Sequence, residues 1–247
     1  MDSRWENKVA VVTGASAGIG AKIAIQLADA GMVVVGLARR PELIKALQEN
    51  VSGSGQIHSR KCDVTDETEV LDAFKWIADS FGEIHVFVNN AGIIKAAFML
   101  DSPTEDFKEL FNVNVVASCL CVREALKVMR AHGTNGHIVI INSILGHRVP
   151  DVPVPLFSVY PSTKHAISAL CQTVRQEIHF HKLNIKLTSI SPGMVDTDFL
   201  GVYDSSMYGQ LPKLKPEDVA GAVMYALNTP SYVQIEDIIL QAMFRHE

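Results

Sequence analysis

The chain has 247 residues, 48% of them hydrophobic, and a formal net charge of −5. A chain of this length and apolar content can bury one sizeable core, so we expect a single domain over residues 1–247. Acidic and basic residues are interspersed, which excludes the basic footprint of a nucleic-acid-binding protein and a polybasic membrane patch. The composition favours small-molecule chemistry.

The cysteines and the terminal composition predict a cytoplasmic protein. Four thiols without a metal-ligand or disulfide spacing indicate core residues in a reducing compartment, so we expect no metal site. Charges occupy the first six residues, where a secretion signal would need an apolar stretch. The longest uncharged run, 219–235, is short and interrupted by glycine and proline, so we expect no membrane span. The cysteines are Cys62, Cys119, Cys121 and Cys171.

Short apolar, β-branched runs alternate with longer segments of helical period. This alternation is typical of βαβ units and predicts an α/β protein: one Rossmann fold with a doubly wound, seven-stranded parallel sheet and helices on both faces. The predicted strands are 9–13, 33–37, 56–62, 85–89, 137–142, 186–191 and 238–240. The predicted helices are 19–29, 41–49, 67–81, 104–131, 160–181 and 216–227.

Two of the helices carry explicit start signals. Asp66 followed by Glu69 has the spacing of a capping box, and Pro216 suits the first turn of a helix. In an open sheet of this kind, ligands bind beyond the carboxyl ends of the strands. Residues directly after each strand are therefore the site candidates.

A glycine-rich turn joins the first strand to the first helix. Glycine there permits a tight turn, close approach of the backbone to a pyrophosphate, and helix–strand contact, with the helix N-terminus facing the anion. We interpret this turn as a dinucleotide site; the alternative is an ordinary turn. The residues expected to line the dinucleotide are Gly14, Ser16, Ala17, Gly18, Ile19 and Gly20.

The second strand ends in Ala38, Arg39 and Arg40. An NAD site needs a carboxylate at this point for the ribose 2′-hydroxyl, whereas the 2′-phosphate of NADP is bound by a guanidinium. Arg39 and Arg40 therefore predict NADP(H). The alternative is that they are solvated charges at the start of the next helix, although acidic residues are more usual there.

Two further segments follow strands. After the third strand, Asp63 and Val64 are placed to meet the adenine, with the Asp63 side chain accepting from its amino group. After the fourth strand comes Asn89-Asn90-Ala91-Gly92. Both segments fall at the carboxyl edge, so residues 1–100 form mainly the cofactor-binding half.

Tyr160 and Lys164 stand four residues apart at the start of a helix, and so share one face. A free tyrosine has a pKa of about 10, and a nearby cation lowers it toward the range in which the phenol can act as acid and base. Such spacing alone usually means a surface helix. Its position downstream of a dinucleotide signature favours a catalytic pair.

Ser143 and Asn114 complete the chemical half, residues 101–247. Ser143 ends the fifth strand, where its hydroxyl could bind the substrate oxygen. Asn114 lies in an otherwise apolar helix, and a buried amide must find partners. A solvent-facing position for Asn114 is the alternative, and Asn112 competes for the same role.

These motifs resemble those of the short-chain dehydrogenase/reductase family in order and context, over nearly the whole chain. The resemblance implies that Asn114, Ser143, Tyr160 and Lys164 form a proton-relay tetrad, with Tyr160 and Lys164 also touching the cofactor. It implies a homodimer or homotetramer through helices 104–131 and 160–181. It further implies that the cofactor is bound by Asn90, Ala91 and Gly92, and by Pro192, Gly193, Val195 and Thr197, with the Pro192-Gly193 turn contacting the nicotinamide amide.

Within the family, the segments 36–40, 146–150 and 234–238 resemble those of insect-type farnesol dehydrogenases and of dehydrogenase/reductase member eleven. The chain departs from the family pattern in lacking the usual glycine-rich C-terminal strand and in its proline-rich approach to Tyr160. The prolines are Pro150, Pro153, Pro155 and Pro161.

Apolar residues around the site predict a lipophilic alcohol or carbonyl substrate, such as a farnesol-like terpenoid alcohol or a steroid. We expect a substrate loop at about 194–214, of which 198–211 forms either a lid or a subunit contact. Two alternatives are a 3-oxoacyl reductase and a nonenzymatic NADPH-binding scaffold. The expected lining residues are Ile94, Phe98, Met99, Val152, Val154, Leu156, Phe157, Phe199, Leu200, Tyr203, Met207 and Tyr208.

Overall fold

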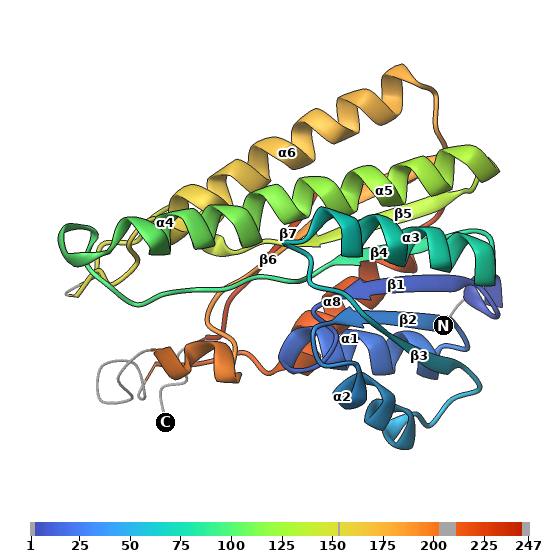
Figure 1. Cartoon of the computed structure of the whole chain (residues 1–247), viewed down its shortest axis with the longest axis horizontal. Helices are drawn as coiled ribbons and strands as arrows, with labels where there is room; N and C mark the ends of the chain where they lie inside the picture. The colour runs from blue at the N-terminus through green and yellow to red at the C-terminus, as the bar shows by residue number, and fades with distance from the viewer. Residues whose placement is uncertain (1–2, 153, 203–210, 244–247) are drawn as a thin grey trace.

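The computed structural model describes residues 3–152, 154–202 and 211–243. Seven parallel strands form one sheet in the order β3-β2-β1-β4-β5-β6-β7, as Figure 1 shows. The order reverses between β1 and β4, which confirms the predicted doubly wound Rossmann fold. The strands are β1 Val9–Thr13, β2 Val33–Ala38, β3 Gln56–Lys61, β4 Val86–Asn89, β5 Gly136–Ile141, β6 Ile185–Pro192 and β7 Asp237–Leu240.

Helices cover both faces of this sheet. In Figure 1, α1, α2 and α8 lie on one side of it, and α3, α5 and α6 lie on the other. The described helices are α1 Gly18–Asp29, α2 Pro41–Ala46, α3 Glu67–Phe81, α4 Thr104–Phe111, α5 Ala117–His132, α6 Tyr160–Phe180 and α8 Pro216–Leu227.

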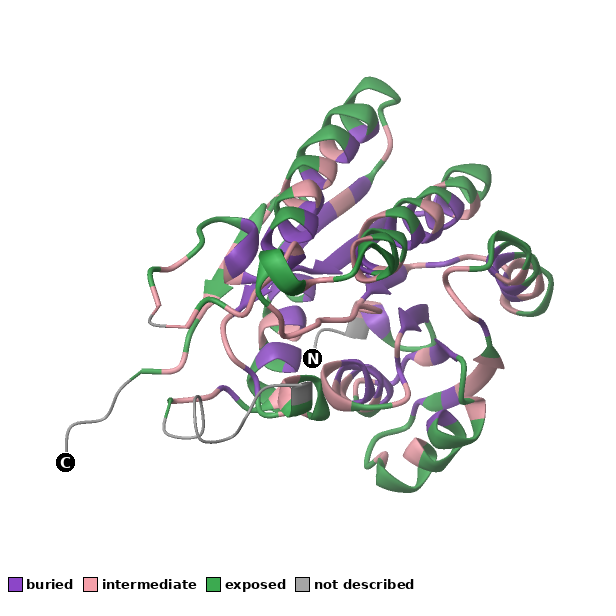
Figure 2. Cartoon of the chain, turned by 60° about the vertical axis from the view of Figure 1, so that its left-hand side comes forward, coloured by how far each residue is buried: buried purple, intermediate pink, exposed green. Residues whose placement is uncertain are grey.

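The central strands are buried on both faces because successive side chains enter different cores. Val12 packs in the core shared with α1 and α8, whereas Val11 packs in the core shared with α3, α5 and α6. Figure 2 shows the sheet and the inward faces of the helices as buried and their outward faces as exposed. Fully burying one such side chain contributes about 1.5–3 kcal/mol before entropic costs. The near-continuous apolar runs of the sequence have this physical origin.

Two predicted helices differ from the structure in their regularity. The helix expected over 104–131 is present, but it contains a π-helical segment, Asn112–Val116, between α4 and α5. The helix expected over 41–49 ends as a 3₁₀ turn, Leu47–Asn50. Hydrophobic periodicity does not distinguish these variants from a regular helix, because each shifts the side chains by only one residue.

One cysteine contradicts the prediction that all four are core residues. Cys62, Cys121 and Cys171 are buried, but Cys119 is exposed on α5. Burial raises the pKa of Cys62 to about 12. Among the described residues, no helix has the length and apolar character needed to cross a bilayer. Within the same residues, no cluster of three or more His, Cys, Asp or Glu is placed to hold a metal ion.

Residues from opposite ends of the sequence meet at the C-terminus of α8. The buried Trp5 donates from Nε1 to Leu227 O at 3.1 Å. The guanidinium of Arg4 donates to the same carbonyl and, at 2.6 Å, to Thr229 O. Lys186 of β6 donates to Thr229 Oγ1 at 2.8 Å. Trp5 and Arg4 thus satisfy carbonyl groups at and just beyond the helix end, which has no intrahelical donors for them, and Lys186 binds the adjacent hydroxyl.

The predicted helix starts are confirmed in part. Asp66 Oδ1 accepts from Glu69 N–H at 3.1 Å and caps α3. Glu69 does not complete the box, because its carboxylate accepts instead from Asp63 N–H at 2.7 Å. Pro216 occupies the first turn of α8, as expected.

We predict that Asp66→Ala lowers the stability of the protein by about 1 kcal/mol, because α3 loses its side-chain cap. For a domain of this size the melting temperature should fall by roughly 2–4 °C in a thermal unfolding experiment. Asp72→Ala, which removes an exposed carboxylate from the middle of α3, is the matched control. Equal melting temperatures for the Asp66 variant and the wild type would contradict the capping role.

Candidate active site

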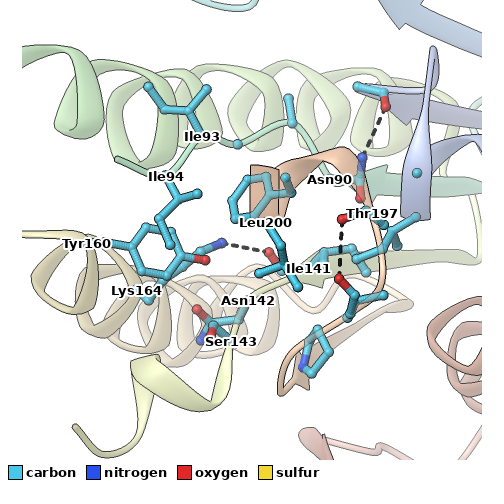
Figure 3. A pocket seen from close by; sticks show the side chains of 18 of the residues that line it. Asn90, Ile93, Ile94, Ile141, Asn142, Ser143, Tyr160, Lys164, Thr197 and Leu200 are labelled. Atoms are coloured by element: carbon cyan, nitrogen blue, oxygen red, sulfur yellow. Dashed lines mark hydrogen bonds between the residues drawn. The ribbon is translucent and has the colours of Figure 1, made fainter. Parts of the chain in front are cut away.

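A cavity of about 730 Å³ lies at the carboxyl ends of the strands. It brings together almost all the predicted site residues from both halves of the chain, and Figure 3 shows part of its wall. The predicted residues that line it are Gly14, Ser16, Ala17, Gly18, Ile19, Arg39, Arg40, Asp63, Val64, Asn90, Ala91, Gly92, Ser143, Tyr160, Lys164, Pro192, Gly193, Val195 and Thr197. The exceptions, Gly20 and Asn114, pack behind this wall.

The glycine turn has the backbone that the sequence predicts. Gly14 and Gly18 adopt positive φ angles of 65° and 54°, which side chains disfavour. A Cβ on Gly20 would collide with Gly14 O and lie 2.5 Å from Asn90 Nδ2. Ala17 precedes α1 without a side-chain cap, so the first N–H groups of the helix suit phosphate oxygens. This cradle fits a dinucleotide.

Asn90 and Thr13 join the ends of β1 and β4, where the strand order reverses. Asn90 Nδ2 donates to Thr13 O at 3.0 Å and to Gly14 O at 3.2 Å. Thr13 Oγ1 accepts from the backbone N–H groups of Asn90 and Ala91 at 3.0 and 3.1 Å. These bonds fix the glycine turn against the fourth strand.

The two arginines after β2 are exposed at the rim of the cavity. They directly precede α2, where positive charge is unfavourable for the helix dipole, so helix stability does not explain them. Asp63 faces the same region and accepts from Thr65 N–H and Oγ1 at 3.0 and 2.7 Å. Partial burial tends to raise the Asp63 pKa, but the Thr65 hydrogen bonds and the Arg39 charge outweigh it and lower the pKa.

Tyr160 and Lys164 are both buried in the first turns of α6. Lys164 Nζ lies 5.8 Å from the centre of the Tyr160 ring and donates to Ile141 O at 3.1 Å, as Figure 3 shows. Burial lowers the pKa of Lys164 to about 8. The rings of Tyr160 and Phe199 pack in an edge-to-face arrangement, with 6.2 Å between the ring centres. Pro161 sits at the second position of the helix, where proline is tolerated.

Asn114 lies in the π-helical segment and is buried, as expected of an amide in an apolar helix. Its Nδ2 donates to Ile93 O at 2.9 Å and to Thr163 Oγ1 at 3.1 Å. Its Oδ1 accepts from Ile93 N–H at 2.8 Å. Asn114 thus joins the loop after β4 to α6, whereas the competing Asn112 is exposed.

Ser143 follows β5 and is buried at the cavity wall. Its Oγ accepts from Leu145 N–H at 3.1 Å and caps a 3₁₀ turn, Ile144–Gly146. Among the described residues, no acceptor receives the hydroxyl proton, because the one hydrogen bond of Oγ is from Leu145 N–H. Ser143 therefore shares the cavity with Tyr160 and Lys164 while keeping a donor to offer.

The predicted apolar wall is partly wrong. Phe98 and Met99 are exposed at the start of a 3₁₀ turn, Met99–Asp101, and neither they nor Val154 and Leu156 line the cavity. The predicted residues Ile94, Val152, Phe157, Phe199 and Leu200 do line it. Tyr203, Met207 and Tyr208, and most of the expected lid, lie outside the described residues. Met194 and Leu211, in the predicted substrate loop, also line it, and the lining residues that the sequence did not predict include Ile93, Val113, Leu145, Arg148, Gln241 and Ala242.

The sequence did contain information that could have identified some of these lining residues. Gln241 and Ala242 follow β7, so the rule that sites lie beyond strand ends points to them. Val113, in the π-helical segment, had no such signal, because a single valine in an apolar helix does not show which face meets a cavity.

The chain belongs to the short-chain dehydrogenase family, whose model matches residues 8–207. It is 44% identical to a farnesol dehydrogenase of Aedes aegypti, over 96% of this chain and 97% of that protein. It is 39% identical to human dehydrogenase/reductase SDR family member 11, over 95% and 94% of the two chains. The resemblance recognised from the motifs is thereby confirmed.

Solved structures agree with this membership. An alcohol dehydrogenase from the archaeon Thermococcus sibiricus, complexed with 5-hydroxy-NADP, superposes with a TM-score of 0.86 at 28% identity, covering 98% of this chain and 99% of that one. A short-chain dehydrogenase/reductase from Mycobacterium marinum also gives 0.86, at 30% identity, covering 96% and 95%. The protein is therefore an oxidoreductase of a family that uses a nicotinamide cofactor.

We predict a pH-dependent stability that comes from Lys164. Below pH 8, Lys164 is charged in both the folded and the unfolded protein, and burial of the charge destabilises the fold in full. As the pH rises from about 8 toward the ordinary lysine value of 10.5, the folded form releases this proton first, and the penalty falls. The wild type should therefore gain stability relative to Lys164→Met across this range.

Thermal unfolding of both proteins from pH 7 to 10.5 measures the effect. Lys45→Met, which removes an exposed ammonium from α2, controls for the loss of a charge in general. A difference in melting temperature between wild type and Lys164→Met that stays constant with pH would contradict the shifted pKa.

Proposed function

We propose that the protein is an NADP(H)-dependent oxidoreductase that interconverts a lipophilic alcohol and its carbonyl compound, with Tyr160 as the acid/base. One observation carries the proposal. The cavity that holds the glycine turn and the two arginines at one end also holds Ser143, Tyr160 and Lys164. A dinucleotide long enough to reach from the arginines along the turn brings its nicotinamide to these three side chains.

The proton chemistry is assigned to Tyr160. In alcohol oxidation the phenolate oxygen takes the hydroxyl proton of the substrate, and in carbonyl reduction the phenol returns it. Lys164 supplies the positive charge that stabilises the phenolate, because its ammonium is held beside the ring and away from bulk water. The nicotinamide, when bound, accepts the hydride from the alcohol carbon or donates it to the carbonyl carbon.

Ser143 and Asn114 support this step in different ways. The Ser143 hydroxyl donates to the substrate oxygen and orients it toward Tyr160. Asn114 is the fourth member of the proposed relay. Its side chain holds Ile93 and the α6 residue Thr163, and Thr163 Oγ1 in turn donates to Tyr160 O at 2.7 Å. The catalytic helix is thus fixed from behind.

The assignment of NADP(H) rests on the rim of the cavity beside β2. Arg39 and Arg40 stand where an NAD site carries a carboxylate, and Ala38 leaves room for the 2′-phosphate. Guanidinium groups bind phosphate oxygens with two parallel hydrogen bonds. A solved neighbour of this chain carries an NADP analogue, which supports the same preference.

The proposal of a lipophilic substrate rests on the end of the cavity opposite the arginines. Ile94, Phe157, Phe199, Leu200 and Leu211 line the cavity near Tyr160, and such walls select apolar ligands. Farnesol, which names one relative of this chain, is a ligand of this kind. A panel of terpenoid alcohols, steroids and short ketones, followed by NADPH absorbance, tests the class, and exclusive turnover of small polar substrates would contradict it.

We expect Tyr160→Phe to reduce kcat by at least about a hundredfold while leaving the Kd for NADPH nearly unchanged, because the ring still packs but the proton donor is gone. Steady-state kinetics and fluorescence titration measure the two quantities. Tyr225→Phe, on the exposed face of α8, is the control. Near-native turnover by Tyr160→Phe between pH 6 and about 10 would remove the acid/base role from this residue.

We expect the pair Ala38→Asp and Arg39→Leu to shift cofactor preference toward NAD. The new carboxylate binds the 2′-hydroxyl and repels the 2′-phosphate, so the ratio of kcat/KM for NADP over NAD should fall by at least about tenfold. Arg130→Leu, at the exposed end of α5, tests whether removal of any arginine has this effect. A native preference for NAD would overturn the cofactor assignment.

A further inference from the structure

A rigid turn connects Ser143 to His147. Gly146 N–H donates to Ser143 O at 2.9 Å, and His147 N–H donates to Ile144 O at 3.0 Å. Ser143 Oγ is itself held by Leu145 N–H. A contact that fixes His147 therefore also restrains the position of Ser143 Oγ.

On one side, the turn is anchored to the helix that carries Tyr160 and Lys164. Ser168, one helical turn beyond Lys164, donates from Oγ to Gly146 O at 2.7 Å. Asn142 Nδ2 donates to the same Ser168 oxygen at 3.0 Å. A Cβ on Gly146 would lie 2.7 Å from Lys164 O, so the turn and α6 are in direct contact.

On the other side, His147 reaches β6 and β7. Its Nε2 lies 2.9 Å from Ser191 Oγ, and Ser191 Oγ donates to Asp237 Oδ1 at 3.0 Å. Because the serine proton goes to the carboxylate, Nε2–H of His147 is the donor in the first bond. The imidazole and the carboxylate are only 27% and 29% exposed, and 3.6 Å separates Nε2 from Oδ1.

Ser191 directly precedes Pro192 and Gly193, the turn proposed to contact the nicotinamide. The β5–β6 pairing ends at Ile141 and Ile190, so the sheet alone does not set the spacing of the segments beyond it. The His147–Ser191 bond is a side-chain link across those segments. Gly193 N–H donates to Leu240 O at 2.8 Å, which extends the same support to β7.

We infer that His147 is a positioning residue, which holds the Ser143 hydroxyl at a fixed place relative to the nicotinamide-binding turn through Ser191 and Asp237. The inference rests on the proposed role of Ser143 in binding the substrate oxygen. Ser168 sets the same turn relative to Tyr160. The turn that carries Ser143 is thus held both to the helix of Tyr160 and to the segment that precedes the nicotinamide-binding turn. Misplacement of a reacting group by about 1 Å can cost on the order of a hundredfold in rate, so this link acts on turnover.

The experiment compares His147→Phe, which fills the space without a donor, with His147→Gln, whose amide nitrogen can reach Ser191. Ser191→Ala removes the acceptor instead. Ser143→Ala and the double variant Ser143→Ala/His147→Phe complete a mutant cycle. His179→Phe, on the exposed last turn of α6, is the matched histidine control. For each protein we would measure kcat, KM, the Kd for NADPH and the melting temperature.

In the wild-type background, His147→Phe and Ser191→Ala should each lower kcat by about tenfold, with less than about a twofold change in the NADPH Kd. His147→Gln should restore most of the loss. In the Ser143→Ala background, His147→Phe should add less than about a twofold loss, because the group that it positions is gone.

Equal losses in both backgrounds, or no loss for His147→Phe while Ser143→Ala is impaired, would overturn the inference and leave the proposed function intact. Unimpaired turnover by Ser143→Ala would instead overturn the proposed role of Ser143. A melting temperature lowered equally in His147→Phe and His147→Gln, without rescue of kcat by glutamine, would reduce His147 to a structural residue.

Discussion

The structure depends on how the ends of β1 and β4 are held together at the point where the strand order reverses. The pairing of β1 with β4 ends at Val12 and Val88, and beyond it the amide of Asn90 and the hydroxyl of Thr13 join the two segments with four hydrogen bonds. The amide fills the volume that any side chain at Gly20 would need. The same contact therefore fixes the ends of β1 and β4, the glycine turn and the N-terminus of α1 relative to one another. These elements in turn determine where a pyrophosphate can bind.

Most of the fold follows from the sequence because both faces of the sheet are buried. β1 and β5 are continuously apolar over 9–12 and 138–141, which is possible because successive residues pack in the cores on opposite faces of the sheet. Their position and parallel direction are therefore strongly determined. The π-helical segment is different. A single wide turn around Asn114 leaves the hydrophobic period on either side intact, so only the buried amide marked the place.

The residues at the cofactor end of the cavity could be predicted more completely than the apolar residues at the substrate end, and the reason is physical. Glycines with positive φ and charges after a strand are dictated by local backbone geometry, which a sequence displays. The apolar wall is assembled from loops whose course depends on tertiary packing. Phe98 and Met99 looked like lining residues but face solvent, whereas Met194 and Ala242 line the cavity. The role of a lone histidine such as His147 cannot be predicted from the sequence, because its partners lie on β6 and β7, far along the chain.

The contact of Arg4 and Trp5 with the end of α8 spans more than two hundred residues, since the Trp5 bond joins positions 222 apart. During synthesis on the ribosome, the acceptors at Leu227 and Thr229 emerge more than two hundred residues after these two side chains. The buried position of the indole therefore cannot form while the chain between them is still being made. Closure of this contact requires that α8 has been synthesised and has docked beside α1.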